Sequence, residues 1–181
     1  YTTFVQRNGT SLSARSIGNK FPVSQIFGGE NFRMNVMYLK QKMFNDRLEF
    51  SVGRLNAGDY FLQSPFYYSY VSNAYDGNPI AVFFNVPYSA YPNAQWGAYL
   101  YSRLSTIFAG KLAVFNTNRA VSINKFHGFN FSFKGDNGVM LISELDLLNN
   151  RDLCFFCCRL PGRYTVGAMY FTGDDQTNFN T

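Results

Sequence analysis

The sequence predicts an all-β protein, and more specifically a transmembrane antiparallel β-barrel. Three observations predict this class. Apolar and polar residues alternate in repeated short segments, the aromatic fraction is 19% while only 15% of residues are charged, and no run of roughly 18 apolar residues could form a transmembrane helix. The mean hydropathy of −0.16 shows that apolar residues are dispersed among polar ones. Strands with one face toward lipid and the other toward water have this composition.

Period-2 alternation recurs along the chain, with turn residues between the alternating segments. The expected apolar faces comprise Phe32, Met34, Val36 and Tyr38; Leu48, Phe50 and Val52; Trp96, Ala98 and Leu100; Leu112 and Val114; Phe129, Phe131 and Phe133; Val139, Leu141 and Leu145; and Tyr164, Val166, Ala168 and Tyr170. A weaker segment covers residues 1–7. We therefore predict about eight strands, several of them near the roughly 9–11 residues that a tilted strand needs to cross a bilayer.

The connections between these strands alternate in length. Those near residues 43–46, 103–108 and 135–137 are short, whereas 8–31, 56–93, 117–127 and 148–161 are long. Outer-membrane barrels show this asymmetry, with short periplasmic turns and long external loops. We predict a single partial β-barrel domain over residues 1–181, with 56–93 as a long inward or external loop. Because Tyr1 is not an initiator Met and no export signal precedes the first strand, we expect a fragment of a longer protein.

Several motifs carry a resemblance to a known family. They are Ser11-Leu12-Ser13-Ala14, Ile17-Gly18-Asn19, Phe27-Gly28-Gly29, Val52 to Asp59, Gly77-Asn78-Pro79, Val86 to Gly97, and Leu160 to Tyr164. In this order they resemble the carbohydrate-selective porin family of the OprB type, and the block from Gly77 to Gly97 is the most specific. The resemblance implies a barrel of about sixteen strands in the bacterial outer membrane, with about half of its wall supplied by this chain. It also implies passive diffusion of small sugars into the periplasm.

A pore for sugars needs side chains that replace the water around the solute. Hydroxyls bond to paired charges and amides, and sugar C–H patches stack on aromatic faces. Strand parity nominates as lumen residues Arg33, Asn35, Arg47, Glu49, Tyr99, Lys111, Asn130, Lys134, Glu144, Asp146 and Arg163. Arg54, which lies at the end of its strand just before the long loop, is the main constriction candidate. The loop residues Asp59, Tyr60, Phe61, Asp76 and Asn78 come next.

Each candidate also has a structural interpretation. Arg33, Arg47 and Lys111 could simply be wall charges paired with acids on neighbouring strands. The loop tyrosines Tyr67, Tyr68, Tyr70 and Tyr75 could stack on sugars or pack the loop against the inner wall, and we favour packing. Trp96 begins a strand on its apolar side, which favours a place in an interfacial aromatic belt.

The three cysteines depart from the family pattern. Cys154, Cys157 and Cys158 lie in Cys-Phe-Phe-Cys-Cys, where the resemblance implies ordinary polar loop residues. We place this segment outside the membrane with the long loops. Exported chains usually oxidise such thiols, so we expect one disulfide among the three and one odd thiol. We do not expect a metal site, because the sequence offers neither a second cysteine pair nor a nearby histidine to complete one. An apolar contact with a partner is the remaining alternative.

The sequence does not predict an enzyme, and it implies no cofactor or metal. His127 is the only histidine, so a nucleophile and base arrangement would rest on it alone. Glu144 and Asp146 share a strand face, as a glycosidase carboxylate pair would, but a solvated or ion-paired lumen face explains them better. The 16 Lys and Arg residues behind the net charge of +5 are scattered, which argues against a nucleic-acid partner.

We therefore predict an outer-membrane porin that lets small carbohydrates diffuse passively, with outer-membrane lipid as its surroundings. Many porins are trimers, so the resemblance is compatible with a homo-oligomer, although no residue marks a subunit interface. Two other classes are kept: a structural or adhesive outer-membrane barrel without sugar selectivity, and a soluble sugar-binding β-sandwich. A conducting pore should keep Arg33 and Arg54 facing water, whereas a plugged barrel should bury them in salt bridges with the loop.

Overall fold

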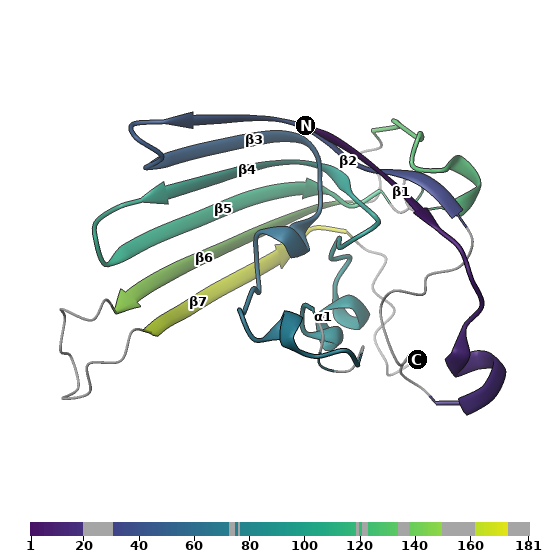
Figure 1. Cartoon of the computed structure of the whole chain (residues 1–181). Helices are drawn as coiled ribbons and strands as arrows, with labels where there is room; N and C mark the ends of the chain where they lie inside the picture. Colours follow the sequence, from purple (N-terminus) through teal and green to yellow (C-terminus); the bar gives the residue numbers. More distant parts are fainter. Residues whose placement is uncertain are drawn as a thin grey trace.

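Seven strands form one antiparallel sheet in sequence order, so that each strand pairs with its neighbours along the chain (Figure 1). The computed structural model describes residues 1–19, 31–72, 75, 77–118, 120, 123–133, 138–149 and 162–173. The strands are β1 (Thr2–Arg7), β2 (Asn31–Met43), β3 (Leu48–Leu55), β4 (Gln95–Arg103), β5 (Phe108–Asn116), β6 (Val139–Asn149) and β7 (Gly162–Phe171). This order confirms the predicted all-β antiparallel architecture.

Helices are short in the part of the chain that the structure describes. They are α1 (Ile80–Asn85), the π-helical turn η1 (Ser13–Ile17) and the 3₁₀ turns η2 (Ala57–Asp59), η3 (Tyr67–Ser69) and η5 (Asn124–Phe126). None of these described helices is long and apolar enough to cross a membrane.

Alternation along the strands gives the sheet two unlike faces. The outer face carries exposed apolar side chains, including Phe50, Val52, Leu100, Leu112, Leu141, Leu145, Val166 and Tyr170. The inner face carries Ser51, Tyr99, Ala113 and Ile142, all buried. The ladders Ser51↔Tyr99, Tyr99↔Ala113 and Ala113↔Ile142 place these residues on one face. The predicted alternation in β3, β4, β5 and β6 is thereby confirmed, and the pairs Leu141↔Tyr170 and Leu145↔Val166 extend the apolar face to β7 as predicted.

In β2 the predicted alternation is wrong from Tyr38 onward. Tyr38 pairs with Gly53 and packs against the buried inner-face cluster, whereas the next residue, Leu39, is 76% exposed on the outer face. The pairing of β1 with β2 shifts register between Thr2 and Phe4. Such a bulge puts an extra residue into one strand and reverses the facing of the residues beyond it.

The predicted strand at Phe129–Phe133 is also wrong, and the described strands number seven rather than eight. The segment is irregular, and two of its rings pack on aromatic rings of the sheet: Phe129 on Phe4 with ring centres 6.3 Å apart, and Phe131 on Trp96 at 6.2 Å. Phe129 and Phe131 are two residues apart, as residues on one face of a strand would be, but each packs on a different ring of the sheet. The alternation of this segment therefore reflects these ring contacts and does not indicate a strand.

Because the described part of the chain has one strand fewer than predicted, the connection between β6 and β7 lies at the opposite end of the sheet from the predicted one. Asn149 pairs with Gly162, and the Leu148 amide donates to the Ile107 carbonyl at 2.7 Å, in the short β4–β5 turn. The flanks of this connection therefore lie at the end with the short turns, whereas the pattern of connection lengths predicts it among the long loops. Cys154, Cys157 and Cys158 themselves lie outside the described residues, so the predicted disulfide remains a prediction.

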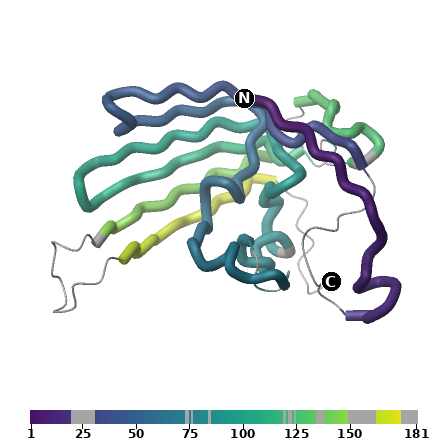
Figure 2. Tube along the Cα trace, in the orientation of Figure 1, coloured from purple at the N-terminus to yellow at the C-terminus, as the bar shows by residue number. Residues whose placement is uncertain are grey.

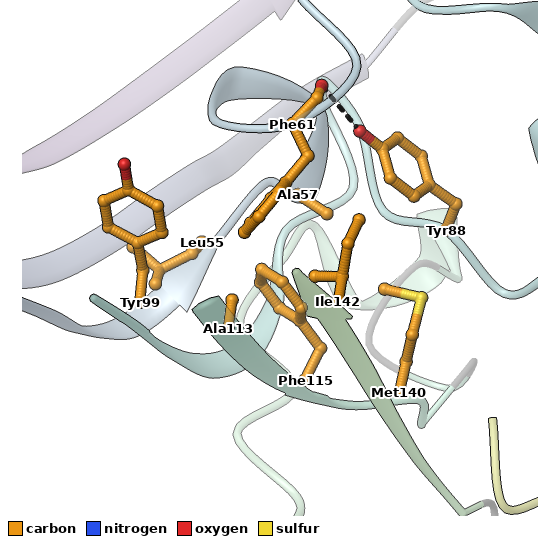
Figure 3. Close-up of a cluster of buried hydrophobic side chains, with 9 residues drawn as sticks. All are labelled: Leu55, Ala57, Phe61, Tyr88, Tyr99, Ala113, Phe115, Met140 and Ile142. Atoms are coloured by element: carbon orange, nitrogen blue, oxygen red, sulfur yellow. Dashed lines mark hydrogen bonds between the residues drawn. The ribbon is translucent and has the colours of Figure 1, made fainter. Parts of the chain in front are cut away.

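The described part of residues 56–93, which we call the inner loop, lies against the inner face of the sheet (Figures 1 and 2). Leu55, Ala57, Phe61 and Tyr88 meet Tyr99, Ala113, Phe115, Met140 and Ile142 in one buried cluster (Figure 3). The Phe61 ring lies edge-on to Tyr99 with centres 5.8 Å apart. Burial of these apolar side chains is what holds the loop on the sheet.

Candidate functional site

A row of four charges crosses the inner face from β5 to β7, with two acids on β6 between a base on each neighbouring strand. Lys111 pairs in register with Glu144, and Asp146 with Thr165. The Lys111 ammonium lies 2.8 Å from Glu144 and 3.7 Å from Asp146, and the Arg163 guanidinium lies 2.8 Å from Asp146. Thr165 donates its hydroxyl to Asp146 at 2.6 Å. Every charge in this row is therefore close to an opposite one, which limits the cost of burial.

Lys111 and Glu144 also hold the inner loop, and we call this pair the loop anchor. The Lys111 ammonium donates to the Tyr60 carbonyl at 2.9 Å, while the Leu62 amide donates to Glu144 Oε1 at 2.6 Å. The two side chains are 9% and 2% exposed. Each member of the pair therefore bonds to its partner and to the loop backbone.

Polar side chains within the inner loop fold it back on itself. The Asn78 amide donates to the carbonyls of Gly58, Phe61 and Leu62 at 3.2, 3.0 and 3.3 Å. The Tyr88 hydroxyl donates to the Phe61 carbonyl at 3.0 Å, as Figure 3 shows. Burial raises the pKa of Tyr88, so this hydroxyl stays protonated and keeps donating.

Asp59 lies at the first turn of the inner loop and reaches water. Its carboxylate accepts a hydrogen bond from the Asn56 amide at 3.1 Å, and Asn56 also donates to Asn35 on β2 at 3.2 Å. The surrounding chain removes part of the water from the carboxyl and raises the pKa of Asp59, an effect that the Asn56 hydrogen bond partly opposes. This triad joins the entry of the loop to the wall.

A cavity of about 270 Å³ opens beside the loop anchor, between the inner loop and the last two strands. It is lined by Leu62, Gln63, Tyr67, Ile142, Ser143, Glu144, Thr165, Gly167, Ala168 and Met169. An aromatic ring beside amide, carboxylate and hydroxyl groups is the combination that suits a sugar, because ring faces contact C–H patches and polar groups bond to hydroxyls.

The structure brings many of the predicted site residues together on the inner face and places the others elsewhere. Glu49, Tyr60, Phe61, Tyr99, Lys111, Glu144, Asp146 and Arg163 meet at or beside the inner face, with Glu49 2.8 Å from Lys40 and the Tyr60 and Tyr99 rings 4.2 Å apart. Arg47 is exposed in the short turn between β2 and β3, and Asn130 lies on the irregular segment after β5. Asp76 and Lys134 lie outside the described residues.

Arg33 and Arg54 do not face water as the sequence analysis expected for a conducting pore. They are 1% and 0% exposed. Arg54 Nη2 donates to the Ala94 carbonyl at 3.0 Å, and Nη1 donates to the Gly128 carbonyl. The Arg54 partners are thus backbone carbonyls, and the salt bridge with the loop that a plugged barrel was expected to make is not what buries it.

Sequence reasoning missed Lys40 and Thr165 as members of the inner face. Lys40 pairs with Ser51 on β3, a position that the bulge in β2 hides from a strict period-2 count. Thr165 could have been found, because it alternates with Tyr164 and Val166 and therefore opposes the apolar face of β7.

Comparisons with known proteins agree with this architecture. The family model described as carbohydrate-selective porin, OprB family, matches residues 1–181. Porin B of Pseudomonas aeruginosa is 24% identical over 176 residues, covering 94% of this chain and 37% of that protein. A solved structure of Pseudomonas putida OprB at high pH superposes with a TM-score of 0.77 at 23% identity, over 95% of this chain and 40% of that one.

These relatives are longer than the chain, which spans well under half of each of them. The structural match shows the same fold, and the family description is that of a channel rather than an enzyme. Because the family model matches the whole sequence, the chain belongs to the OprB family of carbohydrate-selective porins.

Proposed function

We propose that this chain forms part of the wall and of the constriction of an outer-membrane channel through which small carbohydrates diffuse passively. The observation that carries the proposal is the contrast between the two faces of the sheet. The outer face presents apolar side chains suited to lipid, while the inner face combines a charged row with the aromatic inner loop. Family membership supports the same function.

The solute-contacting residues we propose lie where the inner face remains open. Arg163 and Thr165 are exposed on β7 beside Asp146, and Thr165 lines the cavity together with Tyr67 and Gln63. Glu49, on β3, and Tyr60, in the inner loop, lie on the same face. Contacts of this kind stay weak because every charge already has a partner, and weak binding is what lets a solute leave a channel.

Arg33 and Arg54 are not proposed to touch the solute, since neither is exposed. Asn78 is likewise engaged with three loop carbonyls and is assigned to holding the loop. Asp59 stays a candidate at the loop entry. Outer-membrane lipid around the outer face and assembly into a homo-oligomer such as a trimer are part of the proposal.

A structural or adhesive barrel is the second candidate, favoured by one observation. The inner loop lies on the inner face, and both Lys111 and Glu144 of the loop anchor bond to its backbone. The same contacts that would narrow a pore would also plug it. Because the two functions differ in whether solutes pass, one measurement separates them.

The test is the single-channel conductance of the full-length protein in a planar bilayer, titrated with glucose and other small sugars. Current that the sugars block saturably supports the proposal. Steady current indifferent to sugars would replace it with a general porin. No current from correctly folded protein would favour the structural or adhesive barrel.

A further inference from the structure

The sheet has a step at the point where the inner loop leaves it. The pairing of β2 with β3 begins at Met37, opposite Arg54, although β2 itself starts six residues earlier, at Asn31. On its other side this first part of β2 pairs with β1. After Leu55 the chain turns onto the inner face, so β3 supplies no partner for the first part of β2.

Residues Phe126–Phe131, which we call the rim segment, lie against β2 at this step (green in Figure 1). The Met34 amide donates to the His127 carbonyl at 2.9 Å. The His127 ring nitrogen Nδ1 lies 2.7 Å from the Phe32 carbonyl and 2.8 Å from Asn31 Oδ1. The rim segment therefore bonds to β2 on the side where β3 is missing.

Gly128 is the point of closest approach. Its φ of +77° favours glycine, and an added Cβ would lie 2.2 Å from the Met34 carbonyl oxygen. On either side of the step, Phe129 contacts Phe4 of β1 and Phe131 contacts Trp96 of β4. The rim segment thus connects β1 to β4 across the place where β3 has ended, after Leu55.

Arg54 joins this bridge to both ends of the inner loop. It precedes Leu55, the last residue of β3, and it donates to Ala94, the residue immediately before β4. Its other terminal nitrogen donates to Gly128. A guanidinium is a rigid fork with several donors, so one side chain can hold two carbonyls in fixed directions.

We propose that Arg54 is a positioning residue for the pore. It clasps the entry and exit of the inner loop together and fixes both to the rim segment, which sets how far the loop extends into the channel without itself touching the solute. The inference rests on the proposed function in assuming that the inner loop narrows a channel. Asn56, two residues beyond Arg54, bonds to Asn35 and Asp59, so a shift of Arg54 passes directly to the loop entry.

The test compares variants that break the clasp from its two sides, in the full-length protein in planar bilayers. Arg54→Met removes the donors, and Gly128→Ala keeps the arginine but pushes the rim segment away from Met34. Gly110→Ala is the matched control, since its added methyl would meet only Leu104 Cδ1 at 3.9 Å. The readouts are conductance, the reversal potential in a salt gradient, and resistance of the folded band to SDS before heating, which reports folding.

We expect Arg54→Met and Gly128→Ala to change conductance in the same direction by twofold or more, with the reversal potential close to wild type. The double variant should change it no further than the larger single effect, because both substitutions break one clasp. Arg54→Lys should not restore the wild-type value, since an ammonium lacks the fork. Gly110→Ala should match wild type.

Two results would overturn the inference. A reversal potential shifted by Arg54→Met, with wild-type conductance in Gly128→Ala, would place the arginine charge in the ion path. Wild-type conductance in both folded variants would show that the clasp does not position the loop. If Arg54→Met fails to fold, the Gly128→Ala conductance alone decides. Failure of sugars to block the wild-type channel would remove the carbohydrate function and leave this comparison intact.

Discussion

Replacing Lys111 with methionine should release the inner loop from the sheet. Methionine keeps most of the side-chain volume but loses the donors to Glu144 and to the Tyr60 carbonyl. Glu144 would then be a buried carboxylate, 2% exposed, without its closest cation. Removing one partner of a buried ion pair costs about 3–5 kcal/mol. Since Lys111 keeps 9% exposure, we take about 3 kcal/mol, a roughly hundredfold rise in the fraction of molecules with the loop detached.

Chymotrypsin gives a direct assay of this detachment. Residues 56–93 contain many Tyr and Phe but no Lys or Arg, so chymotrypsin can cut the released loop and trypsin cannot. When opening is fast relative to cleavage, the cutting rate follows the open fraction. Glu49→Gln is the control, because the Lys40–Glu49 pair lies on the same face with the Glu49 side chain 17% and the Lys40 side chain 34% exposed, and exposed pairs contribute about 1 kcal/mol or less.

A charge swap tests whether Lys111 and Glu144 hold the loop through its backbone or only pair with each other. Lys111→Glu combined with Glu144→Lys restores an ion pair and the net charge, but it sets a carboxylate against the Tyr60 carbonyl and an ammonium against the Leu62 amide. Acceptor then meets acceptor and donor meets donor, so we expect the swapped protein to be cut as fast as Lys111→Met. Wild-type resistance in the swapped protein would refute the loop anchor and leave only a charge pair.

Three further predictions concern the loop and the wall. Phe61→Ala, at a side chain with 0% exposure, should cost about 3–5 kcal/mol of loop attachment and speed chymotrypsin cleavage. Gly97→Ala would place a Cβ 2.6 Å from Phe115 and 2.7 Å from the Val114 carbonyl, so it should lower the stability of the detergent-solubilised protein in urea by about 1–3 kcal/mol. The raised pKa of Asp59 means that its contribution to stability is complete below the ordinary carboxyl pKa and is lost as pH rises through the raised value. Asp59→Asn should therefore flatten this part of a pH series of melting temperatures, and an unchanged slope would contradict the assignment.

The sequence predicts the faces of the sheet well because one apolar and one polar face impose a simple rule on every strand. Five of the strands follow period-2 alternation, and the same parity brings Lys111, Glu144 and Asp146 to one face. Parity says nothing about a bulge, however. The extra residue in β2 falls where Val36 and Met37 are both apolar, so the count continues smoothly while the true facing of Tyr38 and Leu39 reverses.

The rim segment shows a second limit of prediction from alternation. Alternation indicates which way the side chains point, but it does not indicate which backbone groups form hydrogen bonds. Phe129 and Phe131 alternate because they reach two aromatic rings on the outer face. A hydrogen bond from the Met34 amide to the His127 carbonyl joins this segment to the wall, and no period in the sequence encodes it. The strand count, and with it the end at which the β6–β7 connection lies, depends on that distinction.

Arg54 nevertheless has a signal in the sequence for its buried, carbonyl-bound position. It follows Phe50 and Val52 with a period of two and pairs with Trp96, so it has the parity of the exposed apolar face that we propose lies against lipid. A cation at such a position is costly unless other groups satisfy it. An arginine on the apolar face at the end of a strand therefore predicts that some other segment brings carbonyl oxygens to it. A glycine in a later loop is the residue type that lets a backbone come so close, and Gly128 fills that position.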